Sequence, residues 1–150
     1  MSVQEQERIR IKFYSEAMRY MDDAKNILKN TPRKSGYYCD LKQVKMACRK
    51  AFSGIIAAMV GYLKLEGIQK QKRAVRKAVE THWDRWDFYS NDLSKLNKSI
   101  TQPLISAYQI LYRCVEIDGT TNAKILKHGF DVAYAIIKKI KPKNSIINNQ

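Results

Sequence analysis

Apolar residues recur at intervals of three and four along most of this sequence of 150 residues. The clearest run lies between Leu41 and Leu65, where the spacing is that of a heptad seam on an α-helix. Its members are Leu41, Val44, Cys48, Ala51, Ile55, Ala58, Tyr62 and Leu65. A second stripe, from Phe52 to Leu63, covers another face, so this helix is predicted to lie centrally with neighbours on both sides. Asp40, followed three residues later by Gln43, is predicted to cap its start, and Gly67 to end it.

The same spacing predicts four further helices. One covers residues 4–30 and ends before Pro32, and another covers residues 69–98. The third of these begins at Thr101, which is its predicted N-cap, and the fourth ends before Pro142. The predicted seam residues of these last three helices are Val75, Val79, His82, Trp86, Tyr89, Leu93, Leu96 and Ile100, then Leu104, Tyr108, Leu111 and Val115, then Leu126, Phe130, Ala133, Ile137 and Ile140.

The predicted fold class is therefore all-α, an up-and-down bundle of about five helices, three of them long. No strand-like alternation competes with these patterns, and the segment SGYYC before Asp40 is predicted to add a turn. We expect a single helical domain at residues 1–141 and a frayed tail at residues 142–150. A row of small residues, Ser53, Ala57 and Gly61, is expected to let another backbone come close. Heptad seams of this length also permit self-association, so a homodimer is compatible with the pattern.

Composition narrows the functional classes. The longest charge-free apolar segment, Ala51–Leu63, is shorter than the roughly 20 residues that a bilayer requires, so no membrane partner is expected. The first ten residues are polar and charged, unlike a signal peptide. Cys39, Cys48 and Cys114 are widely spaced, which indicates free thiols in a reducing cytosol. They are interpreted as small core hydrophobes, and neither a metal site nor a cofactor is predicted.

The formal net charge of +14 is concentrated in two parts of the chain. Residues 33–77 carry most of the excess, and the stretch from Gly119 onward carries much of the rest. Because like charges repel, such a concentration favours an anionic partner, either a nucleic acid or an acidic protein. The alternative is a solvated basic face that serves solubility alone.

Two basic groups flank the predicted central helix, and in a bundle they would lie at its opposite ends. The group near its end is the candidate nucleic-acid surface formed by Lys64, Lys70, Lys72, Arg73, Arg76 and Lys77. The group near its start contains Lys42, Lys45 and Arg49, with Arg33, Lys34 and Lys50 close by. We expect a contact with phosphates at both ends, or a dimer that presents both groups.

The stretches AMRYMDDAKNILKN and GYYCDLKQVKMACRKAFSGIIAAMVGYLKLEG together resemble the first two helices of HEPN-like domains. The chain is more closely similar to a small bacterial family of helical proteins described as a domain of unknown function. That similarity extends through KLNKSI, SAYQILY and GFDVAYAIIKKIKP, which is nearly the whole chain. The closer resemblance implies a helical architecture and no particular activity.

HEPN nucleases carry an arginine and a histidine separated by four to six residues, and Arg76 and His82 match that spacing. The resemblance implies that Arg76 would stabilise a phosphate and His82 would assist proton transfer, with two such sites facing each other across a homodimer. The residue after the arginine is commonly Asn, Asp or His in that family, and here it is Lys77. Residues six apart on one helix also point about 120° away from each other. Since His82 falls on the seam of Trp86 and Tyr89, a packed core or interface histidine is the simpler interpretation.

Three hypotheses follow. The first is a nonenzymatic helical protein that binds a polyanion or an acidic protein through its basic helix ends. The second is a metal-independent RNase that uses Arg76 and His82 across a homodimer. The third is an oligomerisation module without a ligand. The residues favour a binding protein over an enzyme.

Overall fold

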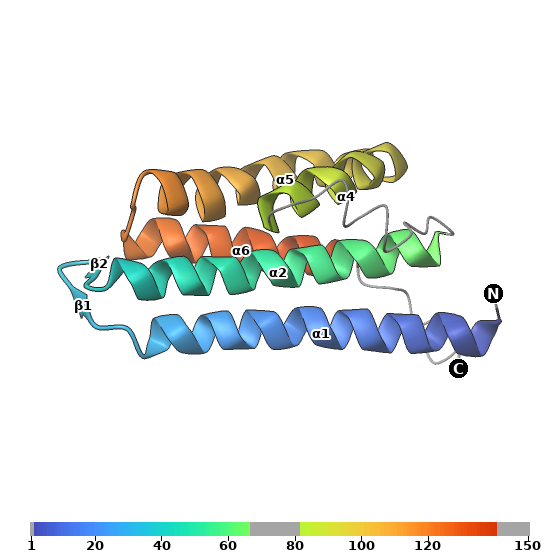
Figure 1. Cartoon of the computed structure of the whole chain (residues 1–150), viewed down its shortest axis with the longest axis horizontal. Coiled ribbons are helices and arrows are strands. Elements are labelled where there is room, and N and C mark those ends of the chain that lie inside the picture. The colour runs from blue at the N-terminus through green and yellow to red at the C-terminus, as the bar shows by residue number, and fades with distance from the viewer. Residues whose placement is uncertain (1, 67–81, 141–150) are drawn as a thin grey trace.

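The structure, a computed structural model, describes residues 2–66 and 82–140, without the side chains of residues 82–85, 87 and 88. Its elements follow in the order α1 (Val3–Lys29), β1 (Arg33–Lys34), β2 (Tyr37–Tyr38), α2 (Leu41–Leu65), α4 (His82–Leu96), the 3₁₀ turn η1 (Lys98–Ile100), α5 (Thr101–Ala107), the π-helical stretch η2 (Tyr108–Ile117) and α6 (Ala123–Lys139). The all-α bundle predicted from the sequence is confirmed. Figure 1 shows α1, α2, α6 and the continuous α5–η2 helix running roughly along the same axis, with α1 on one side of α2 and α4, α5 and η2 on the opposite side.

The ends of α1 and α2 agree with the residues found there. Ser2 and Glu5 form a reciprocal capping box at the start of α1. Asp40 caps α2 by accepting a hydrogen bond of 3.2 Å from the backbone N–H of Gln43. The predicted stop at Gly67 lies outside the described residues.

The connection between α1 and α2 is a small antiparallel β-hairpin, where the sequence analysis had predicted only a turn. Arg33 pairs with Tyr38 and Lys34 with Tyr37. Ser35 and Gly36 form the turn between the strands, both with positive φ, at 54° and 83°. A two-residue turn of this kind matches the twist of paired strands. Strands of two residues are too short to show the alternation by which a sequence reveals them.

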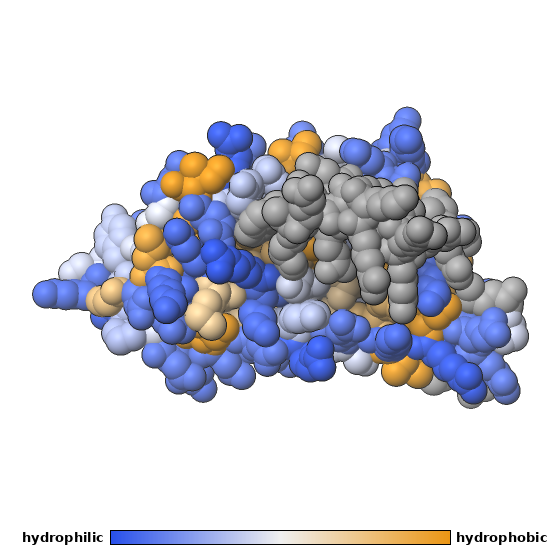
Figure 2. Space-filling model, in the orientation of Figure 1, coloured by the Kyte–Doolittle hydropathy of each residue, from blue (hydrophilic) through white to orange (hydrophobic). Residues whose placement is uncertain are grey.

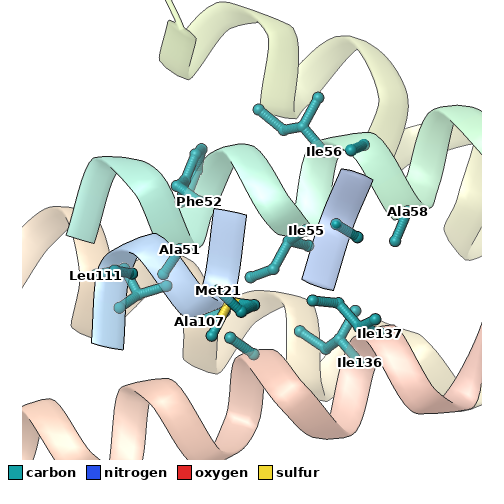
Figure 3. Close-up of a cluster of buried hydrophobic side chains, with 14 of the residues drawn as sticks. Met21, Ala51, Phe52, Ile55, Ile56, Ala58, Ala107, Leu111, Ile136 and Ile137 are labelled. Carbon is teal, nitrogen blue, oxygen red and sulfur yellow. The ribbon is translucent and has the colours of Figure 1, made fainter. Parts of the chain in front are cut away.

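A single hydrophobic core runs through the described helices. Figure 3 shows Met21 from α1, Phe52 and Ile55 from α2, and Leu111 and Ile136 from η2 and α6 meeting in one cluster. Every predicted seam residue of α6 is buried, as are Leu104, Leu111 and Val115 on the preceding helix. The central position of α2 is confirmed, because its contacts reach α1, α4, η2 and α6.

Two glycines of α2 and α6 lie at close helix contacts. A Cβ on Gly61 would collide with the base of the Phe13 side chain, whose Cγ would be only 2.8 Å away. A Cβ on Gly129 would lie 2.5 Å from Cγ2 of Ile110. The expected close approach at the small-residue row therefore occurs at Gly61, where α1 crosses α2.

The helix predicted at residues 69–98 is described only from His82 onward. Trp86, Tyr89 and Leu93 are buried as predicted, whereas Leu96 is 43% exposed because α4 ends there and the chain turns into η1. Val75 and Val79 lie outside the described residues. Thr101 is the first residue of α5 and not its N-cap, since Ile100 holds that position.

Among the described residues, α2 is long and apolar enough to cross a membrane by length and composition. Its most apolar window is 67% buried inside the bundle. The sequence of α2 is therefore accounted for by its place at the centre of the core.

Candidate anion-binding surface

The predicted site residues separate into a described and an undescribed group. Lys70, Lys72, Arg73, Arg76 and Lys77 lie outside the described residues. His82 is the first residue of α4, but its side chain also lies outside the description. Lys64 is described, near the end of α2, with its ammonium 5.7 Å from the centre of the Phe13 ring. It lies about 28 Å along α2 from Lys45, so it belongs to a different end of the bundle.

Lys42, Lys45 and Arg49 lie together on the first turns of α2, and we call them the cationic row. Spacings of three and four residues place all three on one side of a helix. They line an open hollow of about 460 Å³ together with Leu41 and Met46. The two apolar side chains flank the row and are 37% and 40% exposed. The sequence analysis groups these three cations at the start of the central helix, and the structure describes them there, on the first turns of α2.

Arg49 is fixed at one end of the row by Glu116 of η2. Its Nε bonds to Oε1 of Glu116, and its Nη2 bonds to Oε2 at 3.1 Å, so the contact is bidentate. This hydrogen bonding raises the pKa of Arg49 above its ordinary value. The Glu116 side chain is only 12% exposed, while that of Arg49 is 55% exposed. The pair ties α2 to η2 and leaves part of the guanidinium facing solvent.

Lys42 and Lys45 have no such partner among the described residues. Within the described ranges, no carboxylate lies within salt-bridge distance of either ammonium. The nearest acidic residue in the chain, Asp40, uses its carboxylate to cap α2. The two lysines therefore keep their full charge available to a ligand at the hollow.

The hairpin adds further cations at the same end of the bundle. Arg33 lies over the Tyr38 ring, 5.5 Å from its centre, while Lys34 is exposed opposite Tyr37. The start of α6 joins this end, because Tyr37 bridges to Asn122 and Lys124 follows two residues later. Asp118, at the end of η2, is an exposed carboxylate in the same region. Figure 2 shows hydrophilic and hydrophobic side chains interleaved over this end, at the left of the view.

The cysteines occupy three different environments. All three thiols are free; Cys48 is buried, Cys114 is partly buried and Cys39 is exposed. The interpretation of all three as core residues is therefore wrong for Cys39, which follows the hairpin at the surface. Burial raises the pKa of the Cys48 thiol, and the negative charge of Glu116 adds to the effect. A thiol in this state is protonated and inert near neutral pH.

No group of three His, Cys, Asp or Glu side chains in the described ranges could hold a metal ion. His128 is exposed on α6, one residue after Lys127, which is engaged by Asp131 at 2.8 Å. The described surface therefore offers cations and apolar side chains, and not a metal-ligand set.

The fold and the surface together define the class of protein. It is an all-α bundle whose described surface carries a cationic row beside a basic hairpin. The chain belongs to the family described as Domain of unknown function (DUF5618), whose model matches residues 12–142. It is also similar to a solved structure, a protein of unknown function from Dyadobacter fermentans. That similarity has a TM-score of 0.68 and 29% identity, and covers 88% of this chain and 95% of that one. No curated protein matches the chain.

Two residues of this surface escaped the sequence analysis. Glu116 is 67 positions from Arg49, and nothing in the local pattern of either residue indicates the pair. Tyr37 was assigned to a turn, although the dipeptide Ser35–Gly36 is a recognisable turn signal between two pairs of strand-compatible residues.

Proposed function

We propose that the protein is a nonenzymatic binding protein that holds a nucleic acid on the cationic row and the neighbouring hairpin. The observation that supports this proposal most directly is the row itself. Lys42 and Lys45 line a hollow without a carboxylate partner in the described chain, and Arg49 is held beside them by Glu116.

The requirements of folding do not explain these lysines. Two ammonium groups one turn apart on a helix repel each other, which is slightly destabilising, and in the part of the chain that the structure describes neither is compensated by a nearby acid. In a chain with a net charge of +14, additional unpaired cations also raise self-repulsion. Binding of an anion relieves both effects.

A nucleic acid suits the geometry because its charges form a regular chain. Cations spaced along one side of a helix can follow successive phosphates, and each phosphate contact releases bound counterions. An acidic protein segment is the other anionic partner that the same chemistry permits, and it is an outcome of the test below.

The first test measures binding of a labelled single-stranded RNA of about 12 nucleotides at several salt concentrations. Contact with three cations should give a slope near −2 in a plot of log K against log salt, and the double variant Lys42→Gln, Lys45→Gln should reduce that slope by about 1.4. A polyglutamate peptide of similar charge serves as the alternative ligand.

The matched control is Lys95→Gln with Lys138→Gln, which removes the same charge from two exposed lysines away from the hairpin. Lys138 lies in the last turn of α6, whose first turn is at the hairpin. If both double variants lose the same RNA affinity, binding depends only on the total positive charge of the protein, and the proposal is contradicted. Binding of polyglutamate but not of RNA would assign the surface to an acidic protein.

The labelled RNA of this binding test also serves to test the RNase hypothesis. Arg76 and His82 as a catalytic pair stay a prediction, and metal-free cleavage of the RNA by the wild type but not by His82→Ala would support it. Intact RNA in both samples would leave binding as the activity of the protein.

A further inference from the structure

The two tyrosines of the hairpin are used in different ways. Tyr38 is partly buried, packs against the core and is covered by the Arg33 guanidinium. Tyr37 is 52% exposed, because adjacent residues of a strand point to opposite faces and its neighbour Tyr38 faces the core. A large aromatic ring left half in solvent is not explained by packing, and an aromatic face is a surface on which a nucleobase can stack.

The backbone that carries Tyr37 is fixed on both sides. Within the hairpin, the two-residue turn joins it to Lys34. Beyond the hairpin, Tyr37 bridges to Asn122, the Tyr38 N–H donates to the carbonyl of Thr121 at 2.9 Å, and the Ala123 N–H donates to the carbonyl of Gly36 at 2.9 Å. The exposed ring therefore stands on a tethered loop. Little additional backbone order is required when a ligand binds to it.

Two lysines lie near this ring, within the reach of a short strand of nucleic acid. Lys34 is its direct cross-strand neighbour, and residues in that relation have Cβ atoms about 5 Å apart. Lys42 follows five residues later in the chain, so it cannot lie more than about 18 Å from Tyr37. Asp118 is the opposing exposed charge at this end, whereas Asp40 and Glu116 are engaged in the cap and the Arg49 pair.

We infer that Tyr37 is a stacking platform for one unpaired base of a single-stranded nucleic acid, whose phosphates contact Lys34 and the cationic row. This inference rests on the proposed function and narrows it to single strands. In a duplex the flat faces of the bases are covered by their neighbours, so an aromatic ring adds little to duplex binding. Stacking does not depend strongly on base identity, so the surface binds single strands with low sequence preference.

The test compares Tyr37→Ala and Tyr37→Phe with the wild type, using the single-stranded RNA above, the DNA of the same sequence and the corresponding duplexes. Tyr37→Ala should weaken single-strand binding by about tenfold and duplex binding by less than about twofold. Tyr37→Phe keeps the ring and should stay within about twofold of the wild type for both. Melting temperatures of the three proteins are measured alongside, and since Tyr37 is half exposed, we expect them to agree.

A second readout reports on stacking itself. An oligonucleotide that contains 2-aminopurine loses fluorescence when that base stacks on an aromatic ring. Quenching should accompany binding to the wild type and to Tyr37→Phe, and be absent with Tyr37→Ala at saturating protein.

The outcomes separate this inference from the proposed function. If Lys42→Gln with Lys45→Gln abolishes binding while Tyr37→Ala leaves single-strand affinity unchanged, the nucleic-acid surface stands and the stacking platform is wrong. Equal weakening of single-strand and duplex binding by Tyr37→Ala also overturns the platform. If the wild type binds no nucleic acid at low salt, or binds only polyglutamate, the proposed function fails and the inference fails with it.

Discussion

The residues on the buried side of α2 are explained by packing, whereas those on the exposed side of its first turns are not. On the buried side, side chains such as Phe52 and Ile55 are fully enclosed and contact several helices. On the exposed side of its first turns, the cationic row faces a hollow, and only Arg49 has a carboxylate partner in the described chain. The requirements of packing account for the first set of residues in full and for the second set hardly at all.

This difference indicates where function is to be sought in a chain of this kind. A residue whose removal lowers stability is accounted for by the fold, whereas a residue whose removal leaves stability unchanged needs another explanation. Substitutions on and around α2 are therefore expected to differ widely in their effect on the free energy of unfolding.

The largest loss is expected for Phe52→Ala. Phe52 is fully buried and stacks on Trp86 with ring centres 4.1 Å apart, and the Tyr108 ring lies 6.4 Å from it. Removal of a buried aromatic ring leaves a cavity and typically costs about 3–5 kcal/mol. Chemical denaturation followed by circular dichroism measures the change.

The control is Met46→Ala on the same helix, where the side chain is 40% exposed and lines the hollow. Its loss should stay below about 1 kcal/mol, because a large part of the side chain remains in water and its removal at the surface leaves no enclosed cavity. Comparable losses in both variants would mean that the two sides of α2 do not differ as the structure indicates.

A smaller loss is expected for Gly61→Ala. Alanine normally stabilises a helix relative to glycine by about 0.5–1 kcal/mol. At Gly61 the added Cβ would meet Cβ and Cγ of Phe13, atoms near the backbone that cannot swing away, so the sign reverses and the net loss should be about 1–3 kcal/mol. Gly54→Ala is the graded comparison, because its nearest neighbour is the Ala17 carbonyl oxygen at 3.0 Å and its loss should be smaller. A stabilised Gly61→Ala protein would contradict the close contact between α1 and α2.

These packing features were partly predictable from the sequence. Heptad spacing predicted α2 and most of its buried seam, since a long central helix must repeat its apolar residues with the helical period, and Asp40 with Gln43 predicted its N-cap. The first seam residue, Leu41, is an exception, because it is 37% exposed beside the hollow. The π-helical form of η2 was not predictable. Leu111 and Val115 are four residues apart, a spacing that keeps two side chains on the same face in either helical form, so their pattern does not distinguish the two. Leu96 was placed in the core because spacing alone does not show where α4 ends.

A pH-dependent loss is expected from Cys48, which is fully buried on the core side of α2. Its pKa is raised by burial, so the thiol stays protonated in the folded protein at a pH where the unfolded chain ionises it. The unfolded state then binds fewer protons, and stability falls as pH rises above about 8.5. Below that pH the contribution is fully present.

The slope of unfolding free energy against pH between about 8 and 9.5 should therefore be less negative in Cys48→Ala, by up to about 1.4 kcal/mol per pH unit. Cys39→Ala removes an exposed thiol and is the control, with no change of slope expected. Identical slopes in all three proteins would argue against a protonated, buried Cys48.

The candidate surface was less predictable than the core. The sequence grouped Lys42, Lys45 and Arg49 at the start of the central helix, because their positions in the predicted helix are enough for that. It could not reveal that Glu116 engages Arg49 or that Tyr37 stands on a hairpin bound to residues 121–123, because both depend on tertiary contacts between distant segments. The predicted patch around Arg76 lies outside the described residues, so it stays a prediction.

The smallest effect on stability is expected for Lys42→Gln with Lys45→Gln. Neither ammonium has a carboxylate partner in the described chain, and glutamine forms helices about as well as lysine. The two ammonium groups no longer repel each other in this variant, which should offset any contact that their side chains lose. The free energy of unfolding should therefore change by less than about 0.5 kcal/mol. Arg49→Gln provides the contrast, because it leaves the partly buried Glu116 without its bidentate donor and should cost measurably more. If the lysine variant were destabilised as much as Arg49→Gln, the two lysines would have a structural role, and their exposure in the hollow would no longer point to a ligand. An unchanged unfolding curve together with a reduced salt slope for RNA binding would separate folding from function within the first three turns of one helix.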